Sequence, residues 1–147
     1  MILAIDPGTT QSGWVVVHDG KVVDSGVSPN DQILADLHLH CPREVPVAIE
    51  MIASYGMPVG KEVFETCVWI GRFIEAAGDM RVRLIYRKDV KLHLCGTPRA
   101  KDANIRQALI DKLGAPGTKN EPGKTYGVKS HAWAALAVAV TALETNQ

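Results

Sequence analysis

The dipeptide Asp19-Gly20 restricts the fold of this chain more than any other feature. It lies between two segments rich in β-branched residues, Gly13–His18 and Lys21–Val27. An Asp-Gly pair in that position predicts a two-residue turn between antiparallel strands. The short apolar segment Ile2–Asp6 precedes this hairpin and reaches it through a turn rich in Pro, Gly and Thr. The start of the chain is therefore predicted to form three consecutive strands.

After the hairpin, strands alternate with helices. Strands are expected at Val45–Glu50 and Val82–Tyr86, and helices after a cap at Asp31, at Lys61–Ala77, from Thr97-Pro98 to Leu113, and at Lys129–Glu144. Strands separated by a helix usually pair in parallel, whereas hairpin strands pair antiparallel. We therefore expect an α/β fold in a single domain, residues 1–147. Its five-stranded mixed sheet has three antiparallel and then two parallel strands, with helices on both faces.

The composition excludes several classes of protein. Of the 147 residues, 46% are hydrophobic and 22% are charged, which is typical of globular rather than disordered chains. No apolar run approaches the roughly 20 residues of a membrane-spanning helix, and no signal peptide is recognisable. The three cysteines form no C-x-x-C pair, which argues against a disulfide framework and a thiolate zinc site. We expect a cytoplasmic protein without a membrane partner.

Charge is distributed unevenly, although the net charge is zero. Residues 1–80 hold 11 acids and 4 Lys or Arg, whereas residues 81–147 hold 5 acids and 12 Lys or Arg. Such asymmetry indicates an acidic site beside a basic surface that binds a polyanion, unless the two halves are solvated faces of opposite sign. The basic candidates are Lys91, Arg99, Lys101, Arg106, Lys119, Lys124 and Lys129. Tyr55 lies in a loop bounded by Gly and Pro, where its ring either stacks on nucleic-acid bases or covers the edge of the core.

Two acids end predicted apolar strands. Asp6 closes the first strand and Glu50 closes the fourth, and right-handed crossovers bring these strands side by side. Carboxylates are costly at such positions and repel each other unless a cation lies between them. Oxygen ligands favour Mg²⁺ or Mn²⁺. The alternatives are an Asx turn at Asp6 and a surface ion pair at Glu50; together the two acids favour a metal site.

His131 opens the last predicted helix, with Ser130 as its expected cap. A helix N-terminus favours the neutral imidazole, which is the form that binds metals. The alternative is a structural histidine. One turn later, on the same face, stands Ala134.

These motifs resemble the RuvC-like Holliday junction resolvases of the RNase H-like superfamily, in the small form found in phages and bacteria. The resemblance rests on four segments: Ile5-Asp6-Pro7-Gly8-Thr9-Thr10 with Ser12-Gly13-Trp14, Ala48-Ile49-Glu50, Arg87-Lys88-Asp89-Val90-Lys91, and His131 to Ala137. It implies an RNase H-like fold and a homodimer in which each subunit cuts one strand of a four-way DNA junction with two Mg²⁺ ions. We expect the dimer surface on the helix Lys61–Ala77, which carries Phe64, Trp69 and Phe73.

The resemblance also assigns roles to residues. Asp6 and Glu50 match the first two catalytic acids, and His131 matches the third ligand, so these three are the expected metal ligands. Ala134 stands where the family has a fourth acid. Asp102 is a candidate substitute, because it shares a predicted helix face with apolar residues; alternatively it pairs with Arg106 four residues later. Lys91 or Lys101 is the candidate for the basic residue near the scissile phosphate.

The resemblance predicts hydrolysis that leaves a 5′-phosphate and a 3′-hydroxyl on branched DNA, with Mn²⁺ as a possible substitute for Mg²⁺. The missing acid at position 134 keeps open an alternative function, a junction-binding module that does not cut. The Asp-Pro-Gly-Thr-Thr turn is also similar to the phosphate-binding hairpin of actin-like ATPases and sugar kinases. Those proteins need two lobes of this kind, whereas this chain has room for one.

Overall fold

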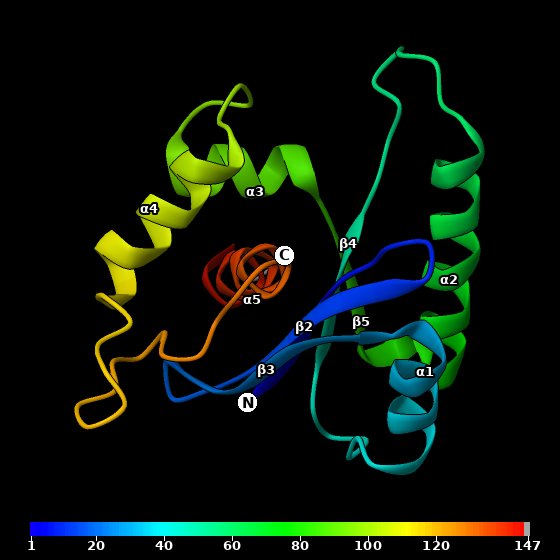
Figure 1. Cartoon of the computed structure of the whole chain (residues 1–147). Coiled ribbons are helices and arrows are strands. Elements are labelled where there is room, and N and C mark those ends of the chain that lie inside the picture. The colour runs from blue at the N-terminus through cyan, green and yellow to red at the C-terminus, as the bar shows by residue number, and fades with distance from the viewer. Residues whose placement is uncertain (146–147) are drawn as a thin grey trace.

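A five-stranded mixed sheet forms the centre of the computed structural model, which describes residues 1–145 (Figure 1). Its strands are β1 (Ile2–Asp6), β2 (Gln11–His18), β3 (Lys21–Pro29), β4 (Val47–Met51) and β5 (Val82–Tyr86), in the order β3-β2-β1-β4-β5. The first three pair antiparallel, and β4 pairs in parallel with both β1 and β5. The predicted sheet is confirmed.

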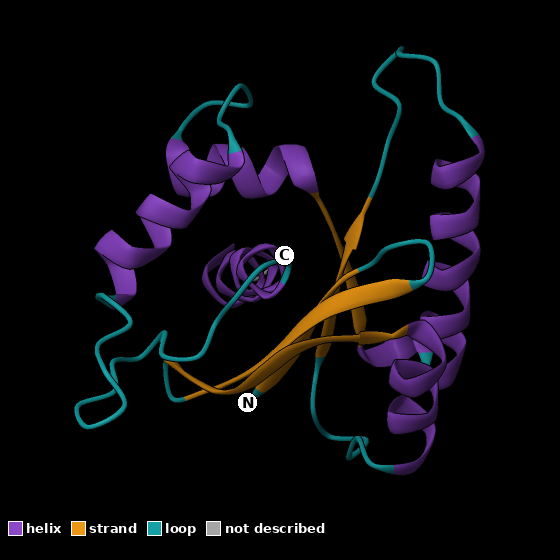
Figure 2. Cartoon of the chain, viewed as in Figure 1, coloured by secondary structure: helices purple, strands orange, loops and turns teal. Residues whose placement is uncertain are grey.

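Helices cover both faces of the sheet (Figure 2). They are α1 (Asn30–Leu39), α2 (Lys61–Ala77), α3 (Arg87–Cys95), α4 (Asp102–Leu113) and α5 (Ala132–Thr145), with a short 3₁₀ turn at Asp79–Arg81. One face is covered by α1 and α2. On the other face α5 packs directly on the strands, and α3 and α4 lie outside it. Within residues 1–145, no helix is both long and apolar enough to span a membrane.

The strands at the centre of the sheet contribute to two cores, because successive side chains point to opposite faces. In β1, Ile2 and Ala4 face α5, whereas Ile5 joins the core beneath α1 and α2. In β4, Ala48 faces α5 and Ile49 faces the other side. By the same alternation, the side chains that follow at the strand ends, positions 6 and 50, belong to the α5 face.

Small side chains let α5 lie close to the strands. Ala4 and Ala48 are fully buried beneath it, and α5 itself presents Ala135 and Ala139 at 0% exposure. Ten of the fourteen residues of α5 are buried. A helix enclosed on this scale is positioned by packing on all sides.

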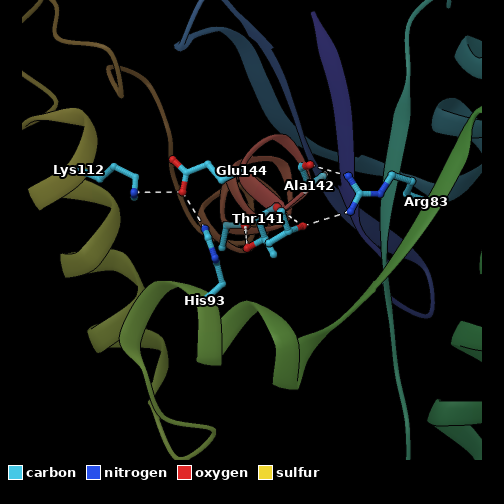
Figure 3. Close-up of polar contacts among 8 residues, drawn as sticks. Arg83, His93, Lys112, Thr141, Ala142 and Glu144 are labelled. Atoms are coloured by element: carbon cyan, nitrogen blue, oxygen red, sulfur yellow. Dashed lines mark hydrogen bonds and ion pairs between the residues drawn. The ribbon is translucent and has the colours of Figure 1, made fainter. Parts of the chain in front are cut away.

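Polar contacts fix the C-terminal end of α5 (Figure 3). Glu144 accepts from His93 of α3 at 2.7 Å and pairs with Lys112 of α4 at 3.1 Å. Arg83 of β5 donates to the carbonyl oxygen of Ala142 and to the hydroxyl of Thr145. These cationic groups also complement the negative end of the helix dipole. Together they tie α5 to three other elements.

The predicted helix from Thr97 to Leu113 begins too early, although its end at Leu113 is confirmed. The chain instead forms α3 from Arg87, which ends where Gly96 adopts a left-handed φ of 74°, and α4 begins only at Asp102. Thr97 and Pro98 lie in the turn between these helices, where the Thr97 hydroxyl accepts from the Arg99 amide. The sequence did not indicate α3, because Val90 is the single buried residue of this helix and its apolar pattern is therefore weak.

Several predicted boundaries shift. The first helix begins at Asn30 after Pro29, with no side-chain cap, so Asp31 is not the capping residue. The last helix begins at Ala132 rather than at Lys129, because Ser130 has a φ of 51°, which a right-handed helix cannot include. The second and third strands extend to Gln11 and Pro29, and the fourth is shifted to Val47–Met51.

A buried polar network holds the turn that follows Asp6. The Ser12 hydroxyl donates to the side-chain oxygen of Asn30 at 2.5 Å, and the Asn30 amide donates to the Gly8 carbonyl at 2.9 Å. The Gly8 amide in turn donates to the Ser12 hydroxyl at 3.1 Å. Ser12 and Asn30 are both almost completely buried. The start of α1 is thereby fastened to the β1–β2 turn.

Replacing Asn30 should therefore destabilise the fold. Asn30→Ala removes the partners of the Ser12 hydroxyl and the Gly8 carbonyl, and we expect a loss of about 1–3 kcal/mol for each group left unsatisfied. Urea denaturation followed by circular dichroism measures this loss. Asn120→Ala, at an exposed asparagine, is the control and should change stability by less than about 0.5 kcal/mol. Equal effects of the two substitutions would contradict the role of the network.

Candidate active site

The ends of β1 and β4 bring Asp6 and Glu50 together. Ile5 pairs with Ile49 across the parallel strands, so the two acids follow at neighbouring positions on the α5 face. Each carboxyl group shifts the pKa of the other, so the two are near neighbours. The Glu50 side chain is only 6% exposed and that of Asp6 only 18%. The predicted convergence of the two acids is confirmed.

Both carboxyl groups resist ionisation in this setting. Burial, followed by the neighbouring Asp6 carboxylate, raises the pKa of Glu50 to about 8. Burial also raises the pKa of Asp6. A divalent cation between the carboxylates would offset both desolvation and mutual repulsion, and oxygen donors of this kind suit Mg²⁺ or Mn²⁺. The donor set therefore fits such a cation.

His131 reaches the acids from the other side. It immediately precedes α5, and its carbonyl oxygen accepts from the Ala135 amide, so the first turn of the helix holds its backbone. Its Nδ1 lies 3.5 Å from Oδ2 of Asp6, while the side chain is 66% exposed. Gly13, which pairs with Asp6 across β1 and β2, lies directly beneath it: a Cβ at position 13 would stand 2.8 Å from the Cβ of His131. A glycine is needed there for His131 to approach Asp6.

Arg87 is the site residue that sequence reasoning missed. It is the first residue of α3, and its guanidinium lies 3.5 Å from Glu50 and forms a direct ion pair with Asp102. Although Arg87 belongs to one of the motifs quoted above, no role was expected for it. Its position directly after β5 could have indicated a role, because Met51 and Tyr86 pair across β4 and β5. That register places residue 87 beside the end of β4.

Asp102 lies at this site but does not point inward as predicted. Its side chain is 85% exposed, because it is the first residue of α4 and its helix face lies outside α5. Its partner is Arg87 rather than Arg106, whose guanidinium lies 4.9 Å from the ring centre of Trp133. Lys101 is exposed and immediately precedes α4.

A small hollow connects these groups. Its volume is about 200 Å³, and the chemically active residues in its lining are Glu50, Arg87, Asp102, Arg106 and His131. Ala134 lines the same hollow, so the side expected for a fourth acid carries a methyl group. Within the described residues 1–145, no three His, Cys, Asp or Glu side chains gather closely enough to form a metal site by themselves.

An aromatic and basic groove adjoins the acids. Tyr55, in the loop after β4, is exposed and has a φ of 47°; the Lys88 ammonium lies 5.8 Å from its ring centre. Tyr55, Lys88 and Lys91 line one hollow together with Arg87 and Pro98. Of the two predicted roles of Tyr55, exposure favours contact with a ligand over covering the core.

The predicted basic residues separate into two groups. Lys91, Arg99, Lys101 and Arg106 belong to α3, the start of α4 and the turn between them, and Lys129 lies two residues before His131. Lys124, in contrast, accepts at its carbonyl oxygen from Val22 beside the β2–β3 turn. That turn is at the sheet end opposite Asp6, since Ile2 pairs with Val17 and Asp6 with Gly13. Lys119 belongs to the same segment after α4 as Lys124.

Two solved structures share this architecture. One is described as T. thermophilus RuvC in complex with a Holliday junction substrate: it is 22% identical, with a TM-score of 0.68. The other is the Thermus thermophilus RuvC structure, 21% identical with a TM-score of 0.66. Each alignment covers 97% of this chain and 92% of the other. No family model and no curated protein matches the sequence. The chain thus has the RNase H-like fold of RuvC, as the sequence motifs predicted.

The raised pKa of Glu50 predicts an unusual pH dependence of stability. An unfolded glutamate loses its proton near the ordinary value of 4.5, whereas the folded chain holds it to about 8. In EDTA, the free energy of unfolding should therefore fall as the pH rises between these two values. Mg²⁺ binds the ionised acids, so its stabilising effect should be larger at about pH 8 than at about pH 5.

Thermal unfolding in EDTA and in Mg²⁺ at several pH values measures both effects. Glu50→Gln should flatten the EDTA profile and reduce the shift by Mg²⁺, whereas Glu44→Gln, at an exposed glutamate, should leave both unchanged. The assignment fails if Glu50→Gln has the same pH profile as the wild type.

Proposed function

We propose that this chain is a structure-selective endonuclease that cuts four-way or otherwise branched DNA by metal-dependent hydrolysis. The observation that carries the proposal is the pair of buried carboxylates, Asp6 and Glu50, at the ends of adjacent strands. Their mutual repulsion gives the site an affinity for divalent cations. The shared fold supports the substrate class, because one similar structure is described as a complex with a Holliday junction.

Asp6 and Glu50 would hold the metal, with His131 as a third donor beside Asp6. A bound Mg²⁺ or Mn²⁺ supplies two kinds of chemistry here: it makes a water molecule more acidic and offsets negative charge on the phosphate. Asp6, Glu50 and His131 would fix the position of this cation relative to the phosphate. Water attacks phosphorus, and the bond to the 3′-oxygen breaks, which leaves a 5′-phosphate and a 3′-hydroxyl.

Contacts to DNA would come from the group of cations near the acids. Lys91, Arg99, Lys101, Arg106 and Lys129 supply positive charge for the phosphate backbone. Tyr55, which is exposed, would stack on a base that the branch leaves unpaired. Lys119 and Lys124 belong to the segment beside the β2–β3 turn, at the sheet end opposite Asp6. They would contact DNA only where an arm of a branched substrate extends that far.

A homodimer would let one protein cut two strands of a junction. Of the three residues predicted for its surface on α2, Phe64 is exposed, Trp69 is partly buried and Phe73 is fully buried in the core. Phe73 is therefore unavailable for a partner. Val68 joins Phe64 as an exposed apolar residue of α2. These two support α2 as the proposed contact surface.

One observation favours a second candidate function. Ala134 provides no ligand, and Asp102 faces Arg87 instead of the acids, so the site has fewer donors than the resemblance implies. With too few donors the chain would bind junctions without cutting them. The two candidates share the DNA surface and differ in catalysis alone.

Removing either acid should separate cutting from binding. Changes to groups that merely support metal ligands cost about 10–100-fold, so we expect Asp6→Asn and Glu50→Gln to lower junction cutting by at least about 100-fold. Binding in EDTA should stay within about twofold, because phosphate contacts come from the basic residues. Labelled four-way junctions with Mg²⁺ or Mn²⁺ measure cutting, and gel shifts in EDTA measure binding. Asp31→Asn, at an exposed acid of α1, is the control. A wild-type protein that binds junctions but never cuts them would establish the second candidate.

The two groups of cations give a test of the DNA surface. Lys91→Gln should weaken junction binding and reduce the slope of log affinity against log salt by about 1. Lys124→Gln removes the same charge at the other end of the sheet and should leave affinity for a short-armed junction unchanged. Fluorescence anisotropy across a salt series measures both. If the two variants lose affinity equally, DNA contacts both ends of the molecule and the proposed surface is too small.

A further inference from the structure

Arg87 places a fixed positive charge inside the acidic site. It follows β5 directly and begins α3, so the sheet register sets its backbone beside Glu50. Its guanidinium contacts Glu50 on one side at 3.5 Å and Asp102 on the other. The side chain is partly buried and its guanidinium contacts carboxylates through both terminal nitrogens, which makes it part of the site.

The hollow that Arg87 lines is also the one that lacks a fourth acid. Ala134, Arg87 and Glu50 line the same space, and Asp102, the remaining acid there, is paired with Arg87. A second metal ion next to Glu50 would need an acidic ligand from this hollow. It would instead meet a guanidinium, whose charge repels it.

The balance of charge leads to the same result. Asp6, Glu50 and Asp102 are three carboxylates, and Arg87 contributes one positive charge, so the ionised set carries a net charge of −2. One divalent cation neutralises this set, whereas two would leave it strongly positive. The Arg87 guanidinium already lies 3.5 Å from Oε1 of Glu50, where a second ion would also have to bind.

We propose that the site binds a single divalent cation, through Asp6 and Glu50, and that the Arg87 guanidinium takes the place of a second metal ion. The inference rests on the proposed function, since it concerns how the same site neutralises a phosphodiester. In that role Arg87 donates hydrogen bonds to the phosphate, a task to which a planar guanidinium is well suited. Asp102 is then a positioning residue that holds Arg87, not a metal ligand. The proposal thus has one bound cation in place of the two Mg²⁺ ions that the resemblance implies.

The number of bound ions tests this directly. Mn²⁺ binding to the full chain, followed by electron paramagnetic resonance of free and bound Mn²⁺, should give one ion per wild-type chain. Arg87→Gln removes the positive charge and should allow a second ion to bind, whereas Arg87→Lys keeps the charge and should remain at one. Arg43→Gln, at an exposed arginine far from the acids in the sequence, should match the wild type.

Cutting measured against Mg²⁺ concentration gives a second readout, because it includes ions that bind together with DNA. The wild-type rate should rise with a Hill slope near 1. Arg87→Gln should shift the curve to higher Mg²⁺ and steepen it toward 2, and Arg87→Lys should retain a slope near 1.

The outcomes separate the two proposals. Two ions bound by the wild type, or a Hill slope near 2, would overturn the single-cation proposal and leave the nuclease function intact. One ion in both the wild type and Arg87→Gln, with unchanged slopes, would overturn the role of Arg87. No bound ion in the wild type would contradict the proposed function itself, and the inference with it. Thermal unfolding of each variant identifies any that fails to fold, and Arg87→Lys keeps the test decisive in that case.

Discussion

The crowding of two carboxylates at the ends of neighbouring strands is the constraint on which the rest of this site depends. Asp6 and Glu50 are brought together by the parallel pairing of β1 and β4, and both side chains are largely buried. Burial raises the pKa of both carboxyl groups, and the neighbouring Asp6 raises that of Glu50 further. Groups held in that condition stabilise a protein only poorly by themselves. Their position is therefore best explained by a cation that binds them, and the surrounding residues are understood through what they do to that cation.

The fold positions the third group of the site through close packing. His131 is carried by the start of α5, and α5 approaches the sheet because Ala4 and Ala48 offer almost no side-chain volume beneath it. At its N-terminal end, the absence of a side chain at Gly13 lets the backbone of His131 come next to Asp6. At its C-terminal end, contacts to α3, α4 and β5 limit sliding along the helix axis. Packing along the whole of α5 thus determines the position of His131 at its beginning.

The range of each interaction along the chain explains which features the sequence predicted and which it did not. The bounds of the strands Ile2–Asp6 and Val82–Tyr86 and of the helix Lys61–Ala77 agree with the structure, because local apolar patterns and turns define them. The meeting of Asp6 and Glu50 followed from topology alone. By contrast, α3 has a single buried residue and left no pattern to detect. The environment of Arg87 and the Ser12–Asn30 network depend on strand register and tertiary packing, which no local pattern contains.

Sequence identity of about one fifth to RuvC is compatible with a change in the chemistry of the site, since different parts of the chain control position and charge. The strand ends and α5 set where the acids and the histidine lie, and these elements are shared with the fold. The charge opposite them is set by single side chains on α5, α3 and α4, namely Ala134, Arg87 and Asp102. Exchanging an acid for a guanidinium in this hollow needs no change of backbone, because Ala134 and Arg87 both line it. A site of this construction can change its number of metal ions while its fold and its first two acids remain fixed.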